Sequence, residues 1–514
     1  MADDGGLSSA WDDDLFGRKK TAKIRRILLR DSINSQVSFF AKWGRKFTVA
    51  EKQKKYSVSV YLKFIIIPII GIVAFFIDIP LPGYTIMGAT VAARSTIPIN
   101  HLTSFVRALL WDGTLKVMPY VVLVLSVYGL VDLIIRRKKH FSNMLNKSFS
   151  IMRVIGVVFV VFAVFNIGPG VMHEAREQLG GRSISEFVMN GILITISLSI
   201  PIAAIFLPFL LNYGLVEFVG VIVRPVMRPL FKLPGRSAVI MITATLGNFS
   251  VAHLAVDDEY AKGQMTERES MAICTGFCSS SVAFMLILAN NSGIADRWNM
   301  YFWSCFFMLL VITIIGVRIF PITKIKNDYA PGVKPQPENV YKKDLVKNAM
   351  REALDVAEAA PNPAKTIGNI LKATVALLAS IVMGAGFSTS VGMLLYFYTP
   401  IFEWIGMIFR PLFMLLQFSS PEVVTASTGA AISLLEVTIP SLLVSAGDWS
   451  VHIRYMMAVL PITSVIFLGS YVPSLLGTNL PVKFWKLLVI WLERMILSVI
   501  IAGLFALLIF GIPG

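Results

Sequence analysis

Long apolar segments separated by short polar ones dominate the pattern of this chain. About nine of these segments have the roughly 20 mainly apolar residues that a helix needs to cross a bilayer. We expect spans at about 59–78, 116–135, 150–168, 187–212, 268–290, 299–320, 367–390, 451–472 and 485–511. The pattern therefore predicts an all-α polytopic membrane protein.

A short motif occurs twice between these segments. Glu217 to Pro225 reads Glu-Phe-Val-Gly-Val-Ile-Val-Arg-Pro, and Glu403 to Pro411 reads Glu-Trp-Ile-Gly-Met-Ile-Phe-Arg-Pro. Apolar residues alternate with polar or charged ones around each copy, which is typical of an amphipathic helix at the membrane surface. We expect the Glu and Arg of each copy to anchor that helix to the lipid interface or to its own hairpin. Internal repeats in membrane proteins indicate two halves built around one central site.

Each copy of the motif is followed by an apolar segment with a polar centre. The first, 236–254, contains Gly247-Asn248-Phe249-Ser250, and the second, 421–446, contains several Ser and Thr residues. Both are too polar at the centre for an ordinary span, so we expect two re-entrant hairpins of half-helices. Non-helical backbone at membrane depth is tolerated only where protein or a water-filled cavity satisfies its polar groups.

The basic residues indicate which ends of the spans face the cytoplasm. The chain has a net charge of +16, with 55% apolar and 15% charged residues, and basic clusters such as Arg136-Arg137-Lys138-Lys139 flank the spans. With a cytoplasmic N-terminus, three predicted spans separate the two motif copies, which then face opposite sides of the membrane. The expected fold is thus about nine transmembrane helices plus two re-entrant hairpins in an inverted repeat.

The same interpretation divides the chain into five parts. They are a cytoplasmic basic N-terminal segment (1–58), N-terminal transmembrane helices (59–186), a first repeat (187–320), a cytoplasmic linker with an amphipathic helix (321–366) and a second repeat (367–514). Residues 18–30 fit either a basic helix on an anionic leaflet or a charge run that sets topology. Residues 83–115 are expected as a partly inserted loop or an interfacial helix. The helix predicted at 341–360 links the halves, with a regulatory role left open.

Polar residues near the hairpin breaks are candidates for a binding site. Half-helix N-termini attract anionic groups, unwound carbonyls hold Na⁺ or accept hydrogen bonds, and hydroxyls orient a solute. The expected substrate-binding residues are Thr245, Gly247, Asn248, Ser250, Ser279, Ser280, Thr425, Ser427, Thr428, Glu436, Thr463 and Ser464. For any single Ser or Thr, the competing interpretation is local satisfaction of carbonyls or helix packing.

Three ionisable residues near the hairpins have more specific expected roles. Glu436 follows the tip of the second hairpin, where a carboxylate is costly unless it is paired or functional. We expect it to bind a substrate ammonium group or to carry a coupling proton; the alternative is a shallower hairpin with Glu436 in water. Glu422 is expected to cap a half-helix, and His253 to be structural.

Three cysteines, Cys274, Cys278 and Cys305, lie in apolar segments. Cys274 and Cys278 share one helix face, but without a His or carboxylate at ligand spacing we expect buried free thiols and no metal site. The sequence contains no phosphate-loop, serine-hydrolase or zinc-protease motif, so an enzyme is not expected. No cofactor is expected, apart from Na⁺ as a candidate coupling ion.

The first repeat resembles a known domain. The run Leu233-Pro234-Gly235-Arg236-Ser237-Ala238, the polar hairpin, Gly263-Gln264-Met265-Thr266 and the Ser-rich span after them are similar to the Gate, or nucleoside-recognition, domain. This domain occurs in concentrative nucleoside transporters, ferrous-iron transporters and YjiH-type membrane proteins, and the whole chain most resembles the YjiH-type group. The resemblance covers about 187–320, with a weaker second copy over 367–511. It implies an inner-membrane transporter with two inverted hairpin repeats and leaves the substrate open.

Together, the residues and the resemblance favour a secondary active transporter coupled to Na⁺ or H⁺. It is expected to move a small polar solute, amino acid-like or nucleoside-like, by alternating access. The alternative is a non-transporting or channel-like Gate-domain protein that acts with a partner. We expect a multi-pass inner-membrane protein with a cytoplasmic N-terminus. Its expected partners are the solute and the bilayer but not nucleic acid, and homo-oligomerisation is left open.

Overall fold

The computed structural model describes residues 55–135, 144–247, 249–336 and 344–512, so the basic segment at 18–30 lies outside the described residues. Eight helical stretches in these ranges are long and apolar enough to cross a bilayer, and the chain is a multi-pass membrane protein. They are Val58–Phe76, Met118–Ile135, Lys147–Phe165, Ile184–Leu211, Glu267–Asn291, Ala295–Gly316, Pro363–Tyr398 and Phe484–Phe510. Each overlaps a predicted span.

The remaining predicted span, at 451–472, is not one helix. α21 (Val451–Ser464) ends near its middle, and α22 (Tyr471–Leu476) begins after the non-helical residues 465–470. The span predicted at 268–290 is also interrupted, because residues 278–281 separate α12 (Glu267–Phe277) from α13 (Val282–Asn291). Both predicted spans are therefore broken inside the apolar run, a feature that the sequence analysis did not predict.

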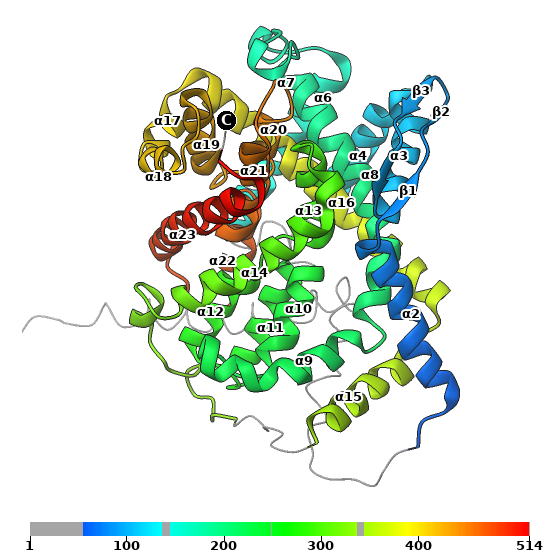
Figure 1. Cartoon of the computed structure of the whole chain (residues 1–514), viewed down its shortest axis with the longest axis vertical. Coiled ribbons are helices and arrows are strands. Elements are labelled where there is room, and N and C mark those ends of the chain that lie inside the picture. The colour runs from blue at the N-terminus through cyan, green and yellow to red at the C-terminus, as the bar shows by residue number, and fades with distance from the viewer. Residues whose placement is uncertain (1–54, 136–143, 248, 337–343, 513–514) are drawn as a thin grey trace, which may run out of the picture. The chain divides into compact units, whose positions relative to one another are not determined.

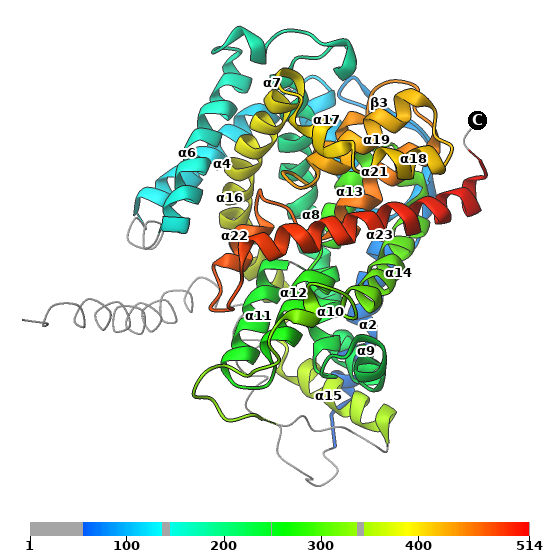
Figure 2. The ribbon, with the colours of Figure 1, turned by 90° about the vertical axis from the view of Figure 1, so that its left-hand side faces the viewer.

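Two sets of helices follow one another in the same order. The first set is α8 (Ile194–Leu211), α9 (Leu215–Val226), α10 (Ser237–Leu246), α11 (Phe249–Ala261), α12, α13 and α14 (Trp298–Gly316). The second set is α16 (Pro363–Tyr398), α17 (Ile401–Gly406), α18 (Arg410–Leu415), α19 (Ser420–Ile432), α20 (Ile439–Leu443), α21, α22 and α23 (Phe484–Phe510). In Figures 1 and 2, α9 to α11 lie in the lower part of the ribbon, and α17 to α19 lie in the upper part.

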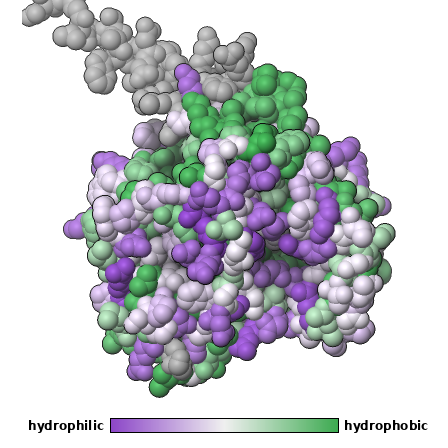
Figure 3. Space-filling model, turned by 90° about the horizontal axis from the view of Figure 1, so that it is seen from above, coloured by the Kyte–Doolittle hydropathy of each residue, from purple (hydrophilic) through white to green (hydrophobic). Residues whose placement is uncertain are grey.

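Helices from the N-terminal part cover the sides of these two sets. α2 (Val58–Phe76) packs against α8, whereas α4 (Met118–Ile135) and α6 (Met144–Phe165) pack against each other and against α16. A short α7 (Ile184–Val188) leads into α8. The polar cap of the upper end is visible in Figure 3, where hydrophilic residues spread across the middle of the face and hydrophobic residues gather mainly at its edges.

The segment between α2 and α4, expected as a partly inserted loop or an interfacial helix, contains two short strand pairs and one helix. β1 (Ile79–Leu81) pairs antiparallel with β4 (Arg94–Thr96), and β2 (Tyr84–Ile86) pairs with β3 (Ala89–Val91). Met87 and Gly88 connect β2 to β3 with φ values of 49° and 82°, the positive φ pair of a tight hairpin turn. α3 (Pro98–Arg107) follows. The described residues are thus helical apart from these short strands and the connecting turns and loops.

The glycine of each motif copy lies against the half-helix that follows. A Cβ atom on Gly220 would come within 2.4 Å of Val239 Cγ2 in α10. One on Gly406 would lie 2.9 Å from the Ser427 carbonyl oxygen in α19. Only glycine permits so close an approach between two backbones. Packing of each surface helix on its own hairpin therefore explains why both copies have glycine here.

The charged residues of the first copy face the linker helix instead of lipid or the hairpin. α15 (Leu345–Ala359) packs against α9 and α2. Arg224 donates to both carboxylate oxygens of Glu352 in α15, at 3.0 and 2.8 Å, and both side chains are largely buried. Arg224 thus anchors α9 to α15 by a bidentate ion pair. In the second copy, Glu403 is exposed.

Glu217 makes this packing sensitive to pH. Its side chain is completely buried, and neither carboxylate oxygen has a hydrogen-bond partner. Burial, with a further contribution from the nearby Glu352 charge, raises the pKa of Glu217 from 4.5 to about 8. The folded protein therefore holds this proton more tightly than the unfolded chain does. The resulting stabilisation is fully present below pH 4.5 and is lost as the pH rises towards 8.

We expect Glu217→Gln to remove this loss of stability. In the wild type, Glu217 alone should cost up to about 1.4 kcal/mol of unfolding free energy per pH unit across that interval. Thermal unfolding of the detergent-purified protein at about pH 5 and about pH 9 should show a smaller fall in Tm for the variant. Glu403→Gln, the exposed equivalent, is the matched control and should behave as the wild type. Equal falls in all three proteins would contradict this account.

Candidate functional site

The two interrupted spans cross at their breaks. The Ser279 hydroxyl, just after α12, donates to the Ile462 carbonyl oxygen near the end of α21 at 2.6 Å. Tyr471, the first residue of α22, donates its hydroxyl to the Cys274 carbonyl oxygen of α12 at 2.6 Å. Segments that are far apart in the sequence therefore meet where each helix is unwound.

Local backbone features end the helices on each side of the breaks. Cys278 leaves the helical region with φ −78° and ψ 56°, and the Ser281 hydroxyl caps α13 by accepting from the Phe284 N–H at 3.3 Å. Val465, after α21, has φ 68°, in the left-handed region that a β-branched residue rarely adopts. Such backbone persists only where the surrounding structure holds it, and it is common at functional sites.

Arg494 of α23 binds the carbonyl ends of both half-helices. Its guanidinium donates to the Thr463 carbonyl oxygen at 2.8 and 3.2 Å and to the Gly276 carbonyl oxygen at 3.5 Å. The last carbonyls of a helix have no partner within it and carry partial negative charge. Arg494 is only 3% exposed, so its charge acts in a dry interior and satisfies both helix ends at once.

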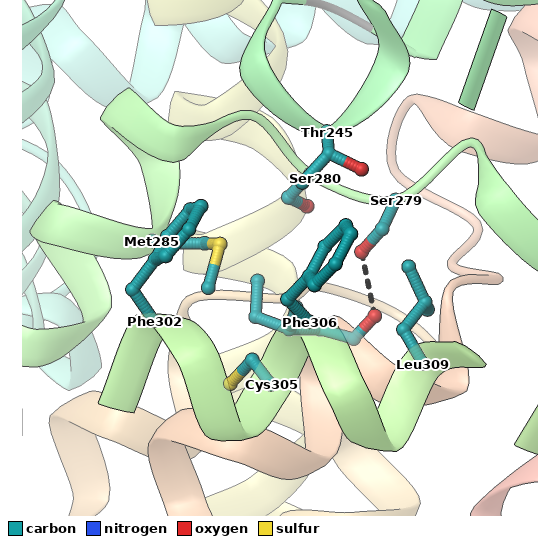
Figure 4. Close-up of a pocket in the computed structure, with 9 residues that line it drawn as sticks. Thr245, Ser279, Ser280, Met285, Phe302, Cys305, Phe306 and Leu309 are labelled. Atoms are coloured by element: carbon teal, nitrogen blue, oxygen red, sulfur yellow. Dashed lines mark hydrogen bonds between the residues drawn. The ribbon is translucent and has the colours of Figure 1, made fainter. Parts of the chain in front are cut away.

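A small cavity lies beside the crossing (Figure 4). Thr245 of α10 and Ser279 and Ser280 of the first break place their hydroxyl side chains on one part of its wall. The rest of the lining consists of Met285, Phe302, Cys305, Phe306, Leu309 and Ile462. The cavity has about 10 Å³ of space, roughly that of one water molecule. The pocket is therefore mainly apolar with a few hydroxyl groups, and it is lined by the first half together with Ile462 of the second half.

A second junction joins the 465–470 break to the turn after α19. The Leu468 N–H donates to the Leu434 carbonyl oxygen at 2.6 Å, and the Gly469 N–H donates to the Leu435 carbonyl oxygen at 2.9 Å. A Cβ atom on Gly469 would lie 2.7 Å from Glu436 Oε2, so the carboxyl group packs directly on the break. The second hairpin and the second interrupted span are thereby held together.

Glu436 at this junction is 6% exposed, so it is enclosed by protein instead of facing water. Its carboxyl group contacts the Ser388 hydroxyl of α16 at 2.5 Å and the Thr438 hydroxyl at 3.3 Å. The ion pairs of the described residues do not include Glu436. A buried carboxylate without a cation is costly, which makes a bound proton or cation favourable here.

The structure brings some predicted binding residues together. Thr245, Ser279 and Ser280 line the cavity, and Gly247 lies at the break between α10 and α11. Thr463 and Ser464 end α21 at the crossing, where their hydroxyls donate to the Val459 and Pro461 carbonyls of the same helix. Their role in substrate binding stays a prediction.

Other predicted binding residues lie elsewhere. Thr425, Ser427 and Thr428 are on α19 and do not line the cavity; Ser427 donates to the Val424 carbonyl oxygen and packs its backbone on the surface helix. Ser250 is on α11, and Asn248 is outside the described residues. Glu422 caps α19, as predicted, because it accepts from the Ser419 backbone N–H at 3.4 Å. It also accepts from the Ser419 hydroxyl at 3.0 Å and from the Ser450 N–H at 3.1 Å.

Sequence reasoning missed three features of the site. Arg494 had a visible signal, because an ionisable residue within the apolar run 485–511 is rare and normally functional. By contrast, Ser388 had no signal in the sequence, because many serines in membrane spans look the same. The structure also brings His253 of α11 close to Cys274 of α12 and to Cys278, the residue just after α12, although the three are not at metal-ligand spacing in the sequence.

Comparison with known proteins identifies a Gate domain in the first set of helices. The family model described as "Gate: Nucleoside recognition" matches residues 193–295, from the start of α8 to just beyond α13. The predicted resemblance is therefore confirmed for this part of the chain. The weaker second copy over 367–511 stays a prediction.

A protein of Alkalihalophilus pseudofirmus, described as uncharacterized, is 26% identical over 458 residues, which cover 87% of this chain and 94% of that protein. CNTnw in an inward-facing substrate-bound state has 14% identity and a TM-score of 0.36, with 79% of this chain and 97% of that one covered. A doubly substituted CNTnw in an outward-facing state has the same identity and TM-score, with 88% and 98% covered. TM-scores this low do not establish a common fold.

We expect Arg494→Met to destabilise the protein strongly. The substitution leaves the buried Thr463 carbonyl oxygen without its donor, at a cost of about 1–3 kcal/mol, whereas the Gly276 carbonyl oxygen still accepts from the Thr313 hydroxyl at 3.0 Å. Thermal or denaturant unfolding in detergent measures the loss. Lys486→Met, two turns earlier on α23, is the matched control and should change stability by about 0.5 kcal/mol or less. A similar small change in both variants would show that Arg494 does not hold the crossing.

Proposed function

We propose that this protein is a secondary active transporter that moves a small polar solute across the inner membrane by alternating access. The observation that carries the proposal is the crossing of two interrupted spans, joined by Ser279 and Ile462 and held by Arg494. Helix breaks at membrane depth are costly, and transporters use them to build solute and ion sites near the midplane.

The proposed architecture is an inverted repeat of two Gate-like halves, 187–320 and 367–514, with about nine spans. In this arrangement α10–α11 and α19–α20 are re-entrant hairpins, and the surface helices of the two halves face opposite sides of the membrane. The opposite placement of α9 and α17–α18 in Figures 1 and 2 supports this arrangement. The N-terminal segment 1–58 and the linker 321–366 lie in the cytoplasm, as the basic clusters favour.

Hydroxyl and backbone groups at the breaks recognise the solute in this proposal. Thr245, Ser279 and Ser280 already share one wall, and Gly247 and Ser250 lie at the adjacent break between α10 and α11. Asn248, which is outside the described residues, is included in the proposed site from the sequence. A cavity of about 10 Å³ is far too small for an amino acid or a nucleoside. Binding therefore requires α10–α11 to move relative to the interrupted span, which is a gating motion. The nucleoside-recognition match favours a nucleoside-like solute over an amino acid-like one.

Coupling to protons is supported by the surroundings of Glu436. The Ser388 hydroxyl has one proton and two acceptors within reach, Glu436 Oε2 at 2.5 Å and the Gly384 carbonyl oxygen at 3.0 Å. When Glu436 is ionised, Ser388 donates to the carboxylate. When Glu436 is protonated, it donates to Ser388, which turns its own proton to Gly384. Both protonation states are hydrogen-bonded, as a group that gains and loses a proton within a membrane requires. Na⁺ at the same carboxylate is the competing coupling ion.

Uptake into proteoliposomes tests this function. With radiolabelled uridine and alanine as probes, the wild type should concentrate one of them when a proton gradient is imposed. Glu436→Gln should reduce accumulation to the level of protein-free liposomes, because the neutral amide cannot exchange a proton. Glu403→Gln, an exposed carboxyl group in the same half, is the control and should accumulate as the wild type does.

Each other result has a definite meaning. If the wild type accumulates solute only under a Na⁺ gradient, Na⁺ and not H⁺ is the coupling ion. Normal accumulation by Glu436→Gln would show that Glu436 does not carry the coupling proton. A wild type that accumulates neither probe, and gains no thermal stability from a panel of nucleosides and amino acids, would favour the non-transporting alternative, because a ligand bound by the native state raises Tm.

A further inference from the structure

Three soft or borderline metal ligands converge between α11 and α12. One ring nitrogen of His253 and the Sγ atoms of Cys274 and Cys278 lie within 4.8 Å of one another, and all three side chains are buried. In a tetrahedral zinc site with Zn–S of about 2.3 Å and Zn–N of about 2.0 Å, ligand atoms are about 3.5–3.8 Å apart. Small side-chain rotations are enough to bring these atoms to coordinating distance.

The imidazole of His253 is oriented for this role. Its Nδ1 lies 3.1 Å from the Ser474 hydroxyl of α22, while Nε2 is buried without a hydrogen-bond partner. The Tyr471 ring packs edge-on against the imidazole, with the ring centres 4.7 Å apart. Metal-bound histidines usually donate their second ring N–H to a polar neighbour, which fixes the tautomer. Ser474 fills that position and leaves Nε2 free to coordinate.

The charge of the site selects among soft ions. Two thiolates and a neutral imidazole around Zn²⁺ give a complex with no net charge, whereas Cu⁺ with the same ligands leaves one negative charge. A neutral complex is the cheaper one in a buried apolar environment. Hard ions such as Mg²⁺ and Ca²⁺ prefer oxygen ligands, which this cluster lacks.

We propose that His253, Cys274 and Cys278 form a binding site for a thiophilic divalent ion, best matched by Zn²⁺. The ion ties α11 of the first hairpin to α12, directly beside the break at Ser279. Since His253 and Cys274 also contact Ser474 and Tyr471 of α22, a bound ion strengthens the junction of the two halves. The open fourth position is filled by water or by a small ligand. The metal site does not rest on the proposed transport function, and a bound ion would restrain the movement of α11 relative to α12 on which that function relies.

Metal binding by the full-length protein tests the site. Tag-free protein in detergent and reducing buffer is equilibrated with Zn²⁺, freed of unbound ion and analysed for zinc. We expect about one zinc ion per chain in the wild type, and less than about a tenth of that in Cys274→Ser and Cys278→Ser. Cys305→Ser, which removes a buried thiol outside the cluster, should keep the wild-type zinc content. Zinc should raise Tm in the wild type and in Cys305→Ser only.

X-ray absorption spectroscopy of the wild-type zinc complex identifies the zinc ligands directly, so this test does not depend on whether the variants fold. The expected first shell contains two sulfur atoms at about 2.3 Å and nitrogen at about 2.0 Å. The Co²⁺-loaded wild type should likewise show thiolate-to-cobalt charge-transfer absorption. A wild type that binds less than about a tenth of an equivalent, or a zinc shell without sulfur, would overturn the proposal. Wild-type zinc content in a folded Cys278→Ser protein would do the same.

Discussion

A helix that stops inside a membrane leaves backbone groups with no water to bind, and this structure depends on how those groups are satisfied. At the crossing, the carbonyl ends of α12 and α21 point at one buried cation, Arg494, while Ser279 donates across the gap to Ile462. Electrostatic attraction between the guanidinium and two helix C-termini thus stabilises both breaks. The cavity and the Glu436 junction lie beside these breaks, where backbone groups do not form helical hydrogen bonds.

The links between the halves differ in strength, and the difference suits a protein that changes conformation. Ser279–Ile462, Tyr471–Cys274 and His253–Ser474 are hydrogen bonds without a full charge. Each contributes about 1 kcal/mol, so a solute that binds one conformation more tightly can shift the balance between two arrangements. Arg494 holds its two carbonyl ends by charge-assisted bonds, which are roughly twice as strong. In the proposed mechanism, the hairpins move while the Arg494 contacts stay.

Apolar run length predicted most helices within a few residues, because the bilayer sets how long an apolar helix must be. It did not predict the break at 465–470, where the sequence Val-Ile-Phe-Leu-Gly-Ser stays mainly apolar. Nor did it predict the break at 278–281, because the three serines there can also be accommodated in a continuous helix. The asymmetry between Glu217 and Glu403 also has no local signal; it arises because α15 packs on α9. Likewise, the pairing of Ser279 with Ile462 and the approach of His253 to Cys274 join distant segments. Arg494, a cation in the middle of the apolar run 485–511, is the residue that the sequence did signal and that the sequence analysis missed.

The sidedness of the two hairpins tests the central claim, an inverted repeat around crossed broken spans, most directly. Asp258→Cys in α11 and Asp448→Cys after α20 place exposed thiols at the outer ends of the two hairpins, whereas Cys274, Cys278 and Cys305 are buried. With a membrane-impermeant maleimide, Asp448→Cys should react from the outside of sealed right-side-out vesicles. Asp258→Cys should react only after the vesicles are permeabilised. Labelling of both positions from the same side would contradict the inverted arrangement.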